Sequence, residues 1–392
     1  MKLGIKGARN APLGFEVDAS EIRSRIAKLT SQESVPDPIS IQEISVVSSG
    51  LLSLDHALGV GGFARGRFHS IEGPEGSGKT ALAVCAVGNF QRLHPYSVHA
   101  FIDVEHTADY EFFTMLGADV NPERLIILRP ETAEEACLMA MTLMGYIIKD
   151  KLWKRDPTIA PVSSITYDSW AGSPTEELGL AQLARVGSEW IPKISTTAGR
   201  MGTTIFWINQ IREKPGISFG DPRYSPGGRA LKHAQTTRLW VSTTNIEKEV
   251  GTKRRIAHDL RVDVQKNKVA PPFEQVHLHL NYRTGFDRIV DAFGFMIKHG
   301  VTYKESPGGN IHTFTFTNEE SESGEKIREG SEKAFLDSIR GNPTAAEAFL
   351  HQAEDFIKQE KEHPGTFRGK SEEDKADRKG RKLLPKAARK TS

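Results

Sequence analysis

Hydrophobic positions follow two different spacings over most of the chain. From about residue 44 to residue 282, short runs rich in β-branched and aromatic residues are separated by longer stretches with helical spacing. The clearest short runs are 67–72, 100–104, 125–128, 165–167 and 204–208. Strands that alternate with helical stretches are typical of βαβ units. The pattern therefore predicts an α/β fold built around a largely parallel sheet.

The N-terminal region predicts one separate helix. Asp18 and Glu21 have the spacing of a capping box, with Asp in place of Ser or Thr, and an apolar stripe follows at Ile22, Ile26 and Leu29. Residues 31–42 (SQESVPDPISIQ) are rich in Pro and Ser and indicate a linker. The stripe needs a partner surface, which is either the helix's own core or a neighbouring subunit.

The pattern changes again after Gly285. An alternating run at 312–317 (HTFTFT) and a helical stretch at 345–358 predict a smaller α/β domain. We therefore expect four parts: the helix and linker at 1–35, the main domain at 36–285, the small domain at 286–358, and a tail at 359–392. No internal repeat is visible in the sequence.

Composition narrows the class of protein. The chain has 392 residues, of which 38% are hydrophobic and 26% charged, which is enough for a sizeable core in a globular protein. No apolar run reaches the roughly 18 residues of a membrane span, and the N-terminus lacks the apolar block of a secretory signal. The two cysteines, Cys85 and Cys137, lie in apolar helical contexts and are expected to be core thiols. These features predict a cytoplasmic protein with no membrane partner.

The charge is balanced overall but not locally. The whole chain carries a formal charge of +2, whereas residues 364–392 hold ten basic and four acidic residues and therefore carry +6. A segment with this charge and few apolar residues is expected to be disordered. It is either a solubilising tail or an arm that binds nucleic acid.

The strongest motif follows the run at 67–72. The loop reads GPEGSGKT and fits G-x-x-x-x-G-K-[ST], with a helical run beginning at Ala81. Such a loop directs backbone N–H groups at phosphate oxygens, with a lysine reaching the β and γ phosphates and a hydroxyl on Mg²⁺. The sequence therefore predicts ATP and Mg²⁺ as cofactors, bound by Gly73, Pro74, Glu75, Gly76, Ser77, Gly78, Lys79 and Thr80.

Two carboxylates complete the predicted hydrolytic site. Asp168 ends the run SSITYD, where a second residue on the metal side is expected. Glu105 ends FIDVE, and a carboxylate at a strand tip beside the phosphate loop can position and polarise water. Glu105 could instead cap a helix or form a salt bridge.

A polar strand end and a basic loop come next. Asn209 and Gln210 end TTIFWINQ and present amides that can bond a terminal phosphate. The loop that follows combines four glycines with basic and aromatic side chains: Gly216, Gly220, Gly227, Gly228, Arg212, Lys214, Arg223, Arg229, Phe219 and Tyr224. Unpaired nucleic acid needs cations for its phosphates and rings for its bases. The loop is thus a candidate DNA-binding loop or a plain surface lid, and Gln210 would link it to the phosphate.

Two histidines are candidate metal ligands. His277 and His279 share one face of HLHL, but no further ligand has metal-site spacing. We expect them to be surface residues of a sheet.

Several of these segments together resemble the RecA family of homologous-recombination ATPases. In family order they are VSSGLLSLDHALGVGGFARGR, GPEGSGKT, IDVEHTADYEFFTMLGADV, YDSW, INQIREKPGISFGDPRYSPGGRALK and DVQKNKVAPPF, and they span most of residues 44–285. The resemblance implies a RecA-type P-loop ATPase core with a mostly parallel, doubly wound sheet. It also implies an N-terminal polymerisation helix and a small α/β C-terminal domain.

The resemblance also assigns individual roles. It implies that Glu105, Lys79 and Gln210 are catalytic, as water activator, nucleotide ligand and γ-phosphate sensor, with Thr80 and Asp168 on the metal side. Asp109 and Phe112 fall at the adenine position, and Phe219 and Arg212 lie in the second DNA-binding loop. Lys266 and Lys268 resemble lysines that reach ATP from the adjacent subunit; the spacing alone would indicate an ordinary solvated pair.

Three departures from the family pattern stand out. The chain is shorter around residues 172–179, where the first DNA-binding loop should lie. The tail is basic, whereas typical bacterial members end in an acidic tail, and the N-terminal region is divergent. Such divergence would fit a phage-encoded member.

The resulting hypothesis is an ATP-dependent DNA recombinase. It would form helical homo-oligomeric filaments on single-stranded DNA and pair them with homologous double-stranded DNA, with single-strand-binding and loader proteins as further partners. The alternatives are a hexameric RecA-fold helicase and a non-catalytic regulator that binds ATP and DNA.

Overall fold

The computed structural model describes residues 44–150, 162–177, 181–213, 223–249, 251–299, 301–306, 309–318 and 321–362. The chain divides into two compact units, Met1–Ser45 and Val46–Ser392. The elements below belong to the second unit. The predicted N-terminal helix, the loop residues 214–222 with Phe219, and residues 363–392 of the predicted tail lie outside the described residues. Residues 359–362, predicted to begin the tail, are helical instead.

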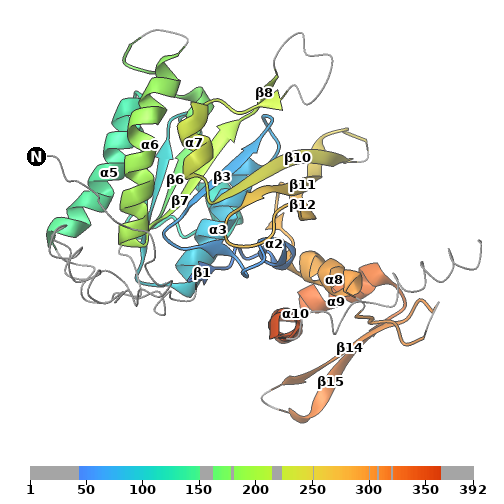
Figure 1. Cartoon of the computed structure of the whole chain (residues 1–392). Helices are drawn as coiled ribbons and strands as arrows, with labels where there is room; N and C mark the ends of the chain where they lie inside the picture. Colours follow the sequence, from blue (N-terminus) through green and yellow to red (C-terminus); the bar gives the residue numbers. More distant parts are fainter. Residues whose placement is uncertain are drawn as a thin grey trace, which may run out of the picture. The chain divides into compact units, whose positions relative to one another are not determined.

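A nine-stranded sheet forms the centre of the second unit (Figure 1). Its strand order is β13-β12-β11-β10-β3-β7-β6-β4-β5. The strands are β3 (Phe68–Gly73), β4 (Val98–Asp103), β5 (Leu125–Leu128), β6 (Val162–Asp168), β7 (Thr204–Gln210), β10 (Thr237–Lys248), β11 (Arg255–Asn267), β12 (Gln275–Asn281) and β13 (Gly285–Phe286). All pairings from β10 through β5 are parallel. This confirms the predicted mostly parallel sheet and its five clearest strands.

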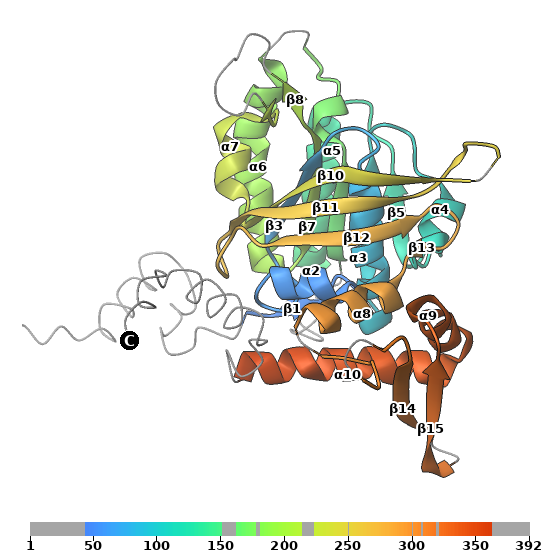
Figure 2. The same cartoon turned by 90° about the vertical axis from the view of Figure 1, so that its right-hand side faces the viewer.

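The other half of the sheet is antiparallel. Strands β10, β11, β12 and β13 pair in sequence order, and Figure 2 shows β10 and β11 running side by side out to a hairpin. Consecutive antiparallel strands need only short turns, whereas parallel strands need a crossover helix. The βαβ interpretation did not distinguish this extension from the parallel half.

Helices cover both faces of the sheet, as a doubly wound fold requires. One face packs against α2 (Leu52–Ala57), α3 (Lys79–Leu93) and α4 (Tyr110–Met115), and the other against α5 (Ala133–Asp150), α6 (Gln182–Met201) and α7 (Gly228–Ala234). Alternation along β7 explains the split, because Phe206 and Ile208 belong to the first core and Ile205 and Trp207 to the second. Both cysteines are free and buried, as predicted.

Short elements complete the main body. They are β1 (Val46–Val47) paired with β2 (Phe63–Ala64), a 3-10 turn η3 (Trp170–Gly172), and β8 (Arg212–Glu213) paired with β9 (Arg223–Tyr224). In the described part of the chain, no helix combines the length and apolar content that a membrane span needs.

The C-terminal elements enclose a core of their own. They are α8 (Arg288–Lys298), β14 (His312–Asn318), β15 (Ser321–Glu329), α9 (Glu332–Gly341) and α10 (Pro343–Glu362). Aromatic side chains such as Phe293, Phe335 and Phe349 fill this core. Helix α8 also contacts α2, where the Ser53 N–H donates to Asp291 Oδ2 at 3.2 Å. The predicted strand at 312–317 and helix at 345–358 correspond to β14 and α10.

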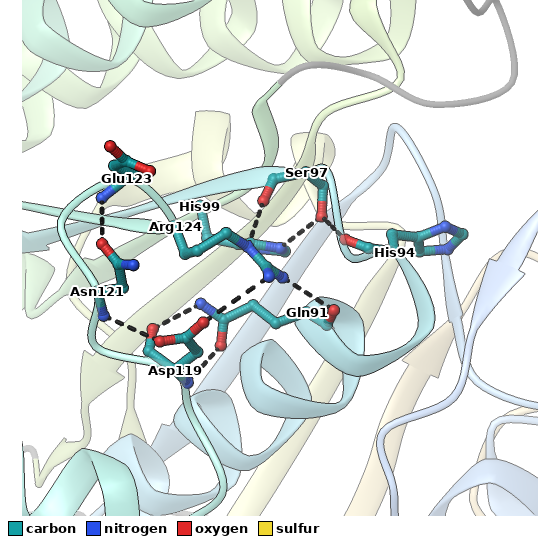
Figure 3. Close-up of polar contacts among 8 residues, drawn as sticks. All are labelled: Gln91, His94, Ser97, His99, Asp119, Asn121, Glu123 and Arg124. Carbon is teal, nitrogen blue, oxygen red and sulfur yellow. Dashed lines mark hydrogen bonds and ion pairs between the residues drawn. The ribbon is translucent and has the colours of Figure 1, made fainter.

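Polar contacts fix the end of α3 to the loop before β5 (Figure 3). Gln91 Nε2 donates to the Asp119 carbonyl oxygen at 2.8 Å, and the Asp119 N–H donates to Gln91 Oε1 at 2.8 Å. Arg124 donates to the carbonyl oxygens of Gln91 and Ser97 at 2.9 and 3.2 Å. Because Gln91 is only 3% exposed, its amide takes the place of water as hydrogen-bond partner for the backbone N–H and carbonyl of Asp119.

Candidate nucleotide-binding site

The phosphate loop connects the end of β3 to the start of α3, as the motif predicts. At two positions of this loop, only glycine fits without a steric clash. A Cβ on Gly73 would lie 2.2 Å from the Val241 carbonyl oxygen, and one on Gly78, where φ is +89°, would lie 2.6 Å from Leu260 Cδ2. Val241 and Leu260 belong to β10 and β11, so the antiparallel extension supports the loop from behind.

Lys79 lies at the first position of α3 and folds back over the loop. Its Nζ donates to the Pro74 carbonyl oxygen at 2.6 Å, and Ser77 Oγ donates to the same oxygen at 2.8 Å. Burial lowers the pKa of Lys79, while the carboxylates of Asp168 and Glu105 oppose that shift. A partly desolvated cation at a helix N-terminus favours a bound polyanion.

Thr80 and Asp168 form the candidate metal position. Thr80 Oγ1 donates to Asp168 Oδ2 at 2.6 Å, which joins the start of α3 to the end of β6. Burial raises the pKa of Asp168 to about 6, against the bond from Thr80. A hydroxyl and a carboxylate side by side are hard oxygen ligands that suit Mg²⁺, which keeps its other positions for water and phosphate oxygens. These residues fit the ion and would hold it, and it would supply positive charge opposite the phosphates.

Glu105 and Gln210, predicted separately, meet in the structure. Gln210 Nε2 donates to Glu105 Oε1 at 3.1 Å, and Ser169 Oγ donates to the same oxygen. Glu105 does not cap the following helix: the N-cap of α4 is Asp109, whose Oδ1 accepts from the N–H groups of Glu111 and Phe112. The structure therefore contradicts the capping interpretation of Glu105, and its catalytic role stays a prediction.

Two residues near Glu105 were missed in the sequence. Ser169 directly follows Asp168, and its hydroxyl orients the glutamate. Asp103 is fully buried beside Asp168 in the sheet register, and its two oxygens accept from the N–H groups of Thr107 and Ala108, each at 3.0 Å. Asp103 thus shapes the turn that carries Glu105. The second carboxylate in FIDVE was the available signal.

Asn209 differs from its prediction. Its Nδ2 donates to Ser225 Oγ at 2.6 Å and to the Pro226 carbonyl oxygen at 2.7 Å, and the residue is fully buried. Successive strand residues point to opposite faces, so Asn209 faces away from the side on which Gln210 meets Glu105. Its amide anchors the end of the basic loop and does not face a phosphate.

Lys266 and Lys268 lie where β11 ends. Lys266 Nζ donates to the Lys232 carbonyl oxygen at 2.5 Å, and Lys268 Nζ donates to the His233 carbonyl oxygen at 2.8 Å. Both bonds satisfy carbonyls in the last turn of α7. Burial lowers the pKa of Lys266, and its neighbour Lys268 lowers it further. Contact of these lysines with the nucleotide of an adjacent subunit stays a prediction.

The remaining sequence candidates lie on other elements of the fold. Asp109 is exposed and Phe112 half-buried on α4, and Arg212 donates from Nη2 to the Ala171 carbonyl oxygen at 3.2 Å. His277 and His279 lie on β12, where His279 Nδ1 is 2.8 Å from Asp259 Oδ1. Within the described residues, no group of three or more His, Cys, Asp or Glu side chains could hold a metal ion.

A mostly parallel sheet, with a phosphate loop between its central strand and a buried helix, defines a P-loop nucleotide-binding α/β protein. The family model for the RecA N-terminal domain matches residues 23–287. The chain belongs to the RecA family.

Individual relatives agree with this assignment. The chain is 36% identical to Protein RecA of Acidothermus cellulolyticus over 304 residues, which is 78% of this chain and 81% of that protein. It is 34% identical to Protein RecA of Cereibacter sphaeroides over 308 residues, which is 78% of this chain and 82% of that protein. Protein RecA of Tropheryma whipplei is 36% identical over 266 residues, and there the match spans 67% of this chain but only 57% of the relative.

Proposed function

We propose that the protein is an ATP-dependent DNA recombinase. It forms helical filaments on single-stranded DNA and catalyses pairing and strand exchange with a homologous duplex. The contact between Gln210 and Glu105 carries the proposal, because it joins the hydrolytic carboxylate to the residue from which the basic loop departs. In this proposal residues 1–35 serve oligomerisation, 36–285 form the ATPase core and 286–358 the small domain.

The hydrolytic step follows from the positions of the side chains. Lys79 and the loop N–H groups hold the triphosphate. Glu105 accepts a proton from a water molecule while the water oxygen forms a bond to the γ-phosphorus. At the same time the bond between the γ-phosphorus and the β–γ bridging oxygen breaks, and ADP leaves. Ser169 keeps the Glu105 carboxylate in place. Gln210 can exchange its bond to Glu105 for one to the γ-phosphate, so its position reports whether that phosphate is present.

DNA binding is assigned to the loop between Gln210 and α7. Arg212 and Arg229 are exposed at its two ends, and Tyr224 is 37% exposed beside them. Cations that meet phosphates and rings that meet bases bind a single strand with little sequence preference. Base pairing between the bound strand and the duplex then determines whether the two DNA sequences are homologous. Single-strand-binding and loader proteins are further expected partners.

ATP between subunits explains how hydrolysis releases DNA. Lys266 and Lys268 would leave the α7 carbonyls to contact the triphosphate of the adjacent protomer. A ligand shifts a conformational equilibrium by its differential affinity for the two states. Triphosphate therefore favours the assembled filament, and its loss favours release.

The decisive experiment images the purified protein with a non-hydrolysable ATP analogue and single-stranded DNA, alongside ATP turnover with and without DNA. We expect helical filaments and DNA-stimulated turnover. Lys79→Ala should abolish turnover, and Glu105→Gln should keep nucleotide binding while lowering turnover by at least ~10²-fold. The exposed Glu123→Gln is the matched control and should leave both unchanged.

Other outcomes would overturn the proposal. Closed hexamers that unwind duplexes would indicate a helicase. ATP and DNA binding without strand exchange would indicate a regulator. A protein that stays monomeric under these conditions would contradict filament formation altogether.

A further inference from the structure

A buried polar cluster lies beside the nucleotide loop, on the sheet face that α7 covers. We call it the Glu72 cluster. Glu72 aligns with Asn209 in the β3–β7 register, and Ser70 aligns with Arg238 in the β3–β10 register. Neighbours in a parallel register point to the same face. The cluster consists of Ser70, Glu72, Asn209, Ser225, Gln235 and Arg238.

Glu72 is the centre of this cluster. It is 2% exposed, and its Oε1 accepts from Gln235 Nε2 at 2.7 Å and from Ser70 Oγ at 2.9 Å. Burial raises the pKa of Glu72, while the Arg238 guanidinium and the hydrogen bonds from Ser70, Ser225 and Gln235 oppose that shift. A buried carboxylate with a cation and hydroxyl and amide partners is strongly fixed in position.

The partners of Glu72 belong to two functional segments. Glu72 immediately precedes Gly73, the first residue of the phosphate loop. Ser225 ends the basic loop, and it also accepts from Asn209 Nδ2 at 2.6 Å. The same loop begins at Ile211, whose N–H donates to the Gly73 carbonyl oxygen at 3.2 Å. The start of the loop is thus bonded to the strand that carries the phosphate loop, and its end, at Ser225, is held by Asn209, the aligned neighbour of Glu72 on the adjacent strand.

The cluster also has unused hydrogen-bonding capacity. Among the described residues, Asn209 Oδ1, Gln235 Oε1 and Arg238 Nε are buried and make no hydrogen bond. Buried polar atoms usually have partners, so three exceptions around one carboxylate need a reason. Spare donors and acceptors allow the cluster to adopt a second set of bonds without a net loss of partners. Such an element can take two discrete arrangements.

We propose that Glu72 is a positioning residue that transmits the state of the nucleotide loop to the exit of the DNA-binding loop through Ser225. This rests on the proposed function, in which nucleotide controls DNA affinity. The route is separate from Gln210, which acts at the loop's entrance and contacts Glu105. Glu72 touches neither nucleotide nor DNA.

A purely structural cluster predicts a different result. In that case, altering Glu72 would lower the stability of the protein but leave the link between nucleotide and DNA intact. The link is measured as the coupling factor, the ratio of the single-stranded DNA Kd with ADP to that with a non-hydrolysable ATP analogue. Thermal melting of the same samples measures stability independently.

The test compares Glu72→Gln with the wild type in full-length protein, using fluorescence anisotropy of a labelled oligonucleotide. Glu72→Gln keeps the size of the side chain but removes its charge. We expect the coupling factor to fall by about fivefold or more, within the usual range of coupling between sites. Nucleotide affinity and DNA-independent turnover should stay within about twofold of the wild type. Ser225→Ala should lower the coupling factor in the same way, and the double variant should lower it no further than Glu72→Gln alone.

The controls separate the possible failures. Glu247→Gln makes the same chemical change at the exposed end of β10 and should leave the coupling factor unchanged. If the wild type couples but both Glu72→Gln and Ser225→Ala couple equally well, the inference is wrong and the proposed function stands. If the wild type itself shows no difference between nucleotides, the proposed function fails first. Should Glu72→Gln not fold, Ser225→Ala decides alone.

Discussion

Replacing Asp55 by Asn should make the protein's stability less dependent on pH. Asp55 is 5% exposed in α2, and its Oδ1 accepts from the Ser49 N–H at 2.7 Å. Burial raises the pKa of Asp55 from 3.8 to about 7. The hydrogen bonds from Ser48 and Ser49 lower it and so offset only part of this rise. Between these two values the folded state keeps the proton while the unfolded state releases it. Stability is therefore lost as pH rises from about 4 to 7.

The size of the effect follows from the shift. Each pKa unit corresponds to about 1.4 kcal/mol, so the two units between pH 5 and the folded pKa amount to roughly 3 kcal/mol. Asn cannot ionise, but it can still accept from the Ser49 N–H. The unfolding free energy of Asp55→Asn minus that of the wild type should thus be about 3 kcal/mol more favourable to the variant at pH 8 than at pH 5.

Urea unfolding at pH 5, 6, 7 and 8, followed by tryptophan fluorescence, measures this difference. Asp337→Asn removes an exposed carboxylate and serves as the control, for which the difference from wild type should be the same at each pH. If Asp55→Asn also differs from the wild type by a constant amount at pH 5 and pH 8, then Asp55 is ionised in the folded protein and the reasoning is refuted.

Three further predictions address the site, the fold and the tail. Gly172→Ala would place a Cβ 3.0 Å from Glu105 Oε1 and displace that carboxylate. The variant should lower kcat by roughly tenfold with little change in melting temperature. Unchanged steady-state ATP turnover would contradict this prediction. Gln91→Leu removes both partners of the Asp119 backbone and should lower the unfolding free energy by about 2 to 3 kcal/mol in urea at pH 7; a loss below about 0.5 kcal/mol would show that water replaces them. Deleting residues 364–392 removes a charge of +6 and should flatten the salt dependence of DNA affinity, whereas an unchanged slope would leave the tail as a solubiliser.

The nucleotide site was readable from the sequence because its signals are local. The phosphate loop occupies consecutive residues, and Asp168, Glu105 and Gln210 each stand at the carboxyl end of a recognisable hydrophobic run. Parallel strands bring those ends to one edge of the sheet. The contacts of Thr80 with Asp168 and of Gln210 with Glu105 follow from that geometry.

The Glu72 cluster could not be read in the same way. In RFHSIE, Glu72 looks like a polar residue at a strand end, and its partner Gln235 lies 163 positions later. The antiparallel extension was missed for a related reason: the alternation along β10 and β11 predicts strands but does not indicate their direction. Asn209 shows that neighbouring amides with the same chemistry can serve opposite faces of a strand.

Strands β3 and β7 are neighbours in the sheet, so they place the start of the nucleotide loop beside the start of the basic loop. Gly73 opens the phosphate loop at the end of β3, and Gln210 opens the basic loop at the end of β7, its aligned partner. A packed sheet does not deform continuously, so a change at one strand end can reach the other only through groups with alternative partners. Gln210 at one end of the basic loop and the Glu72 cluster at the other are such groups. If the proposed function holds, coupling between ATP and DNA is therefore expected to proceed through rearrangement of side chains at these two strand ends.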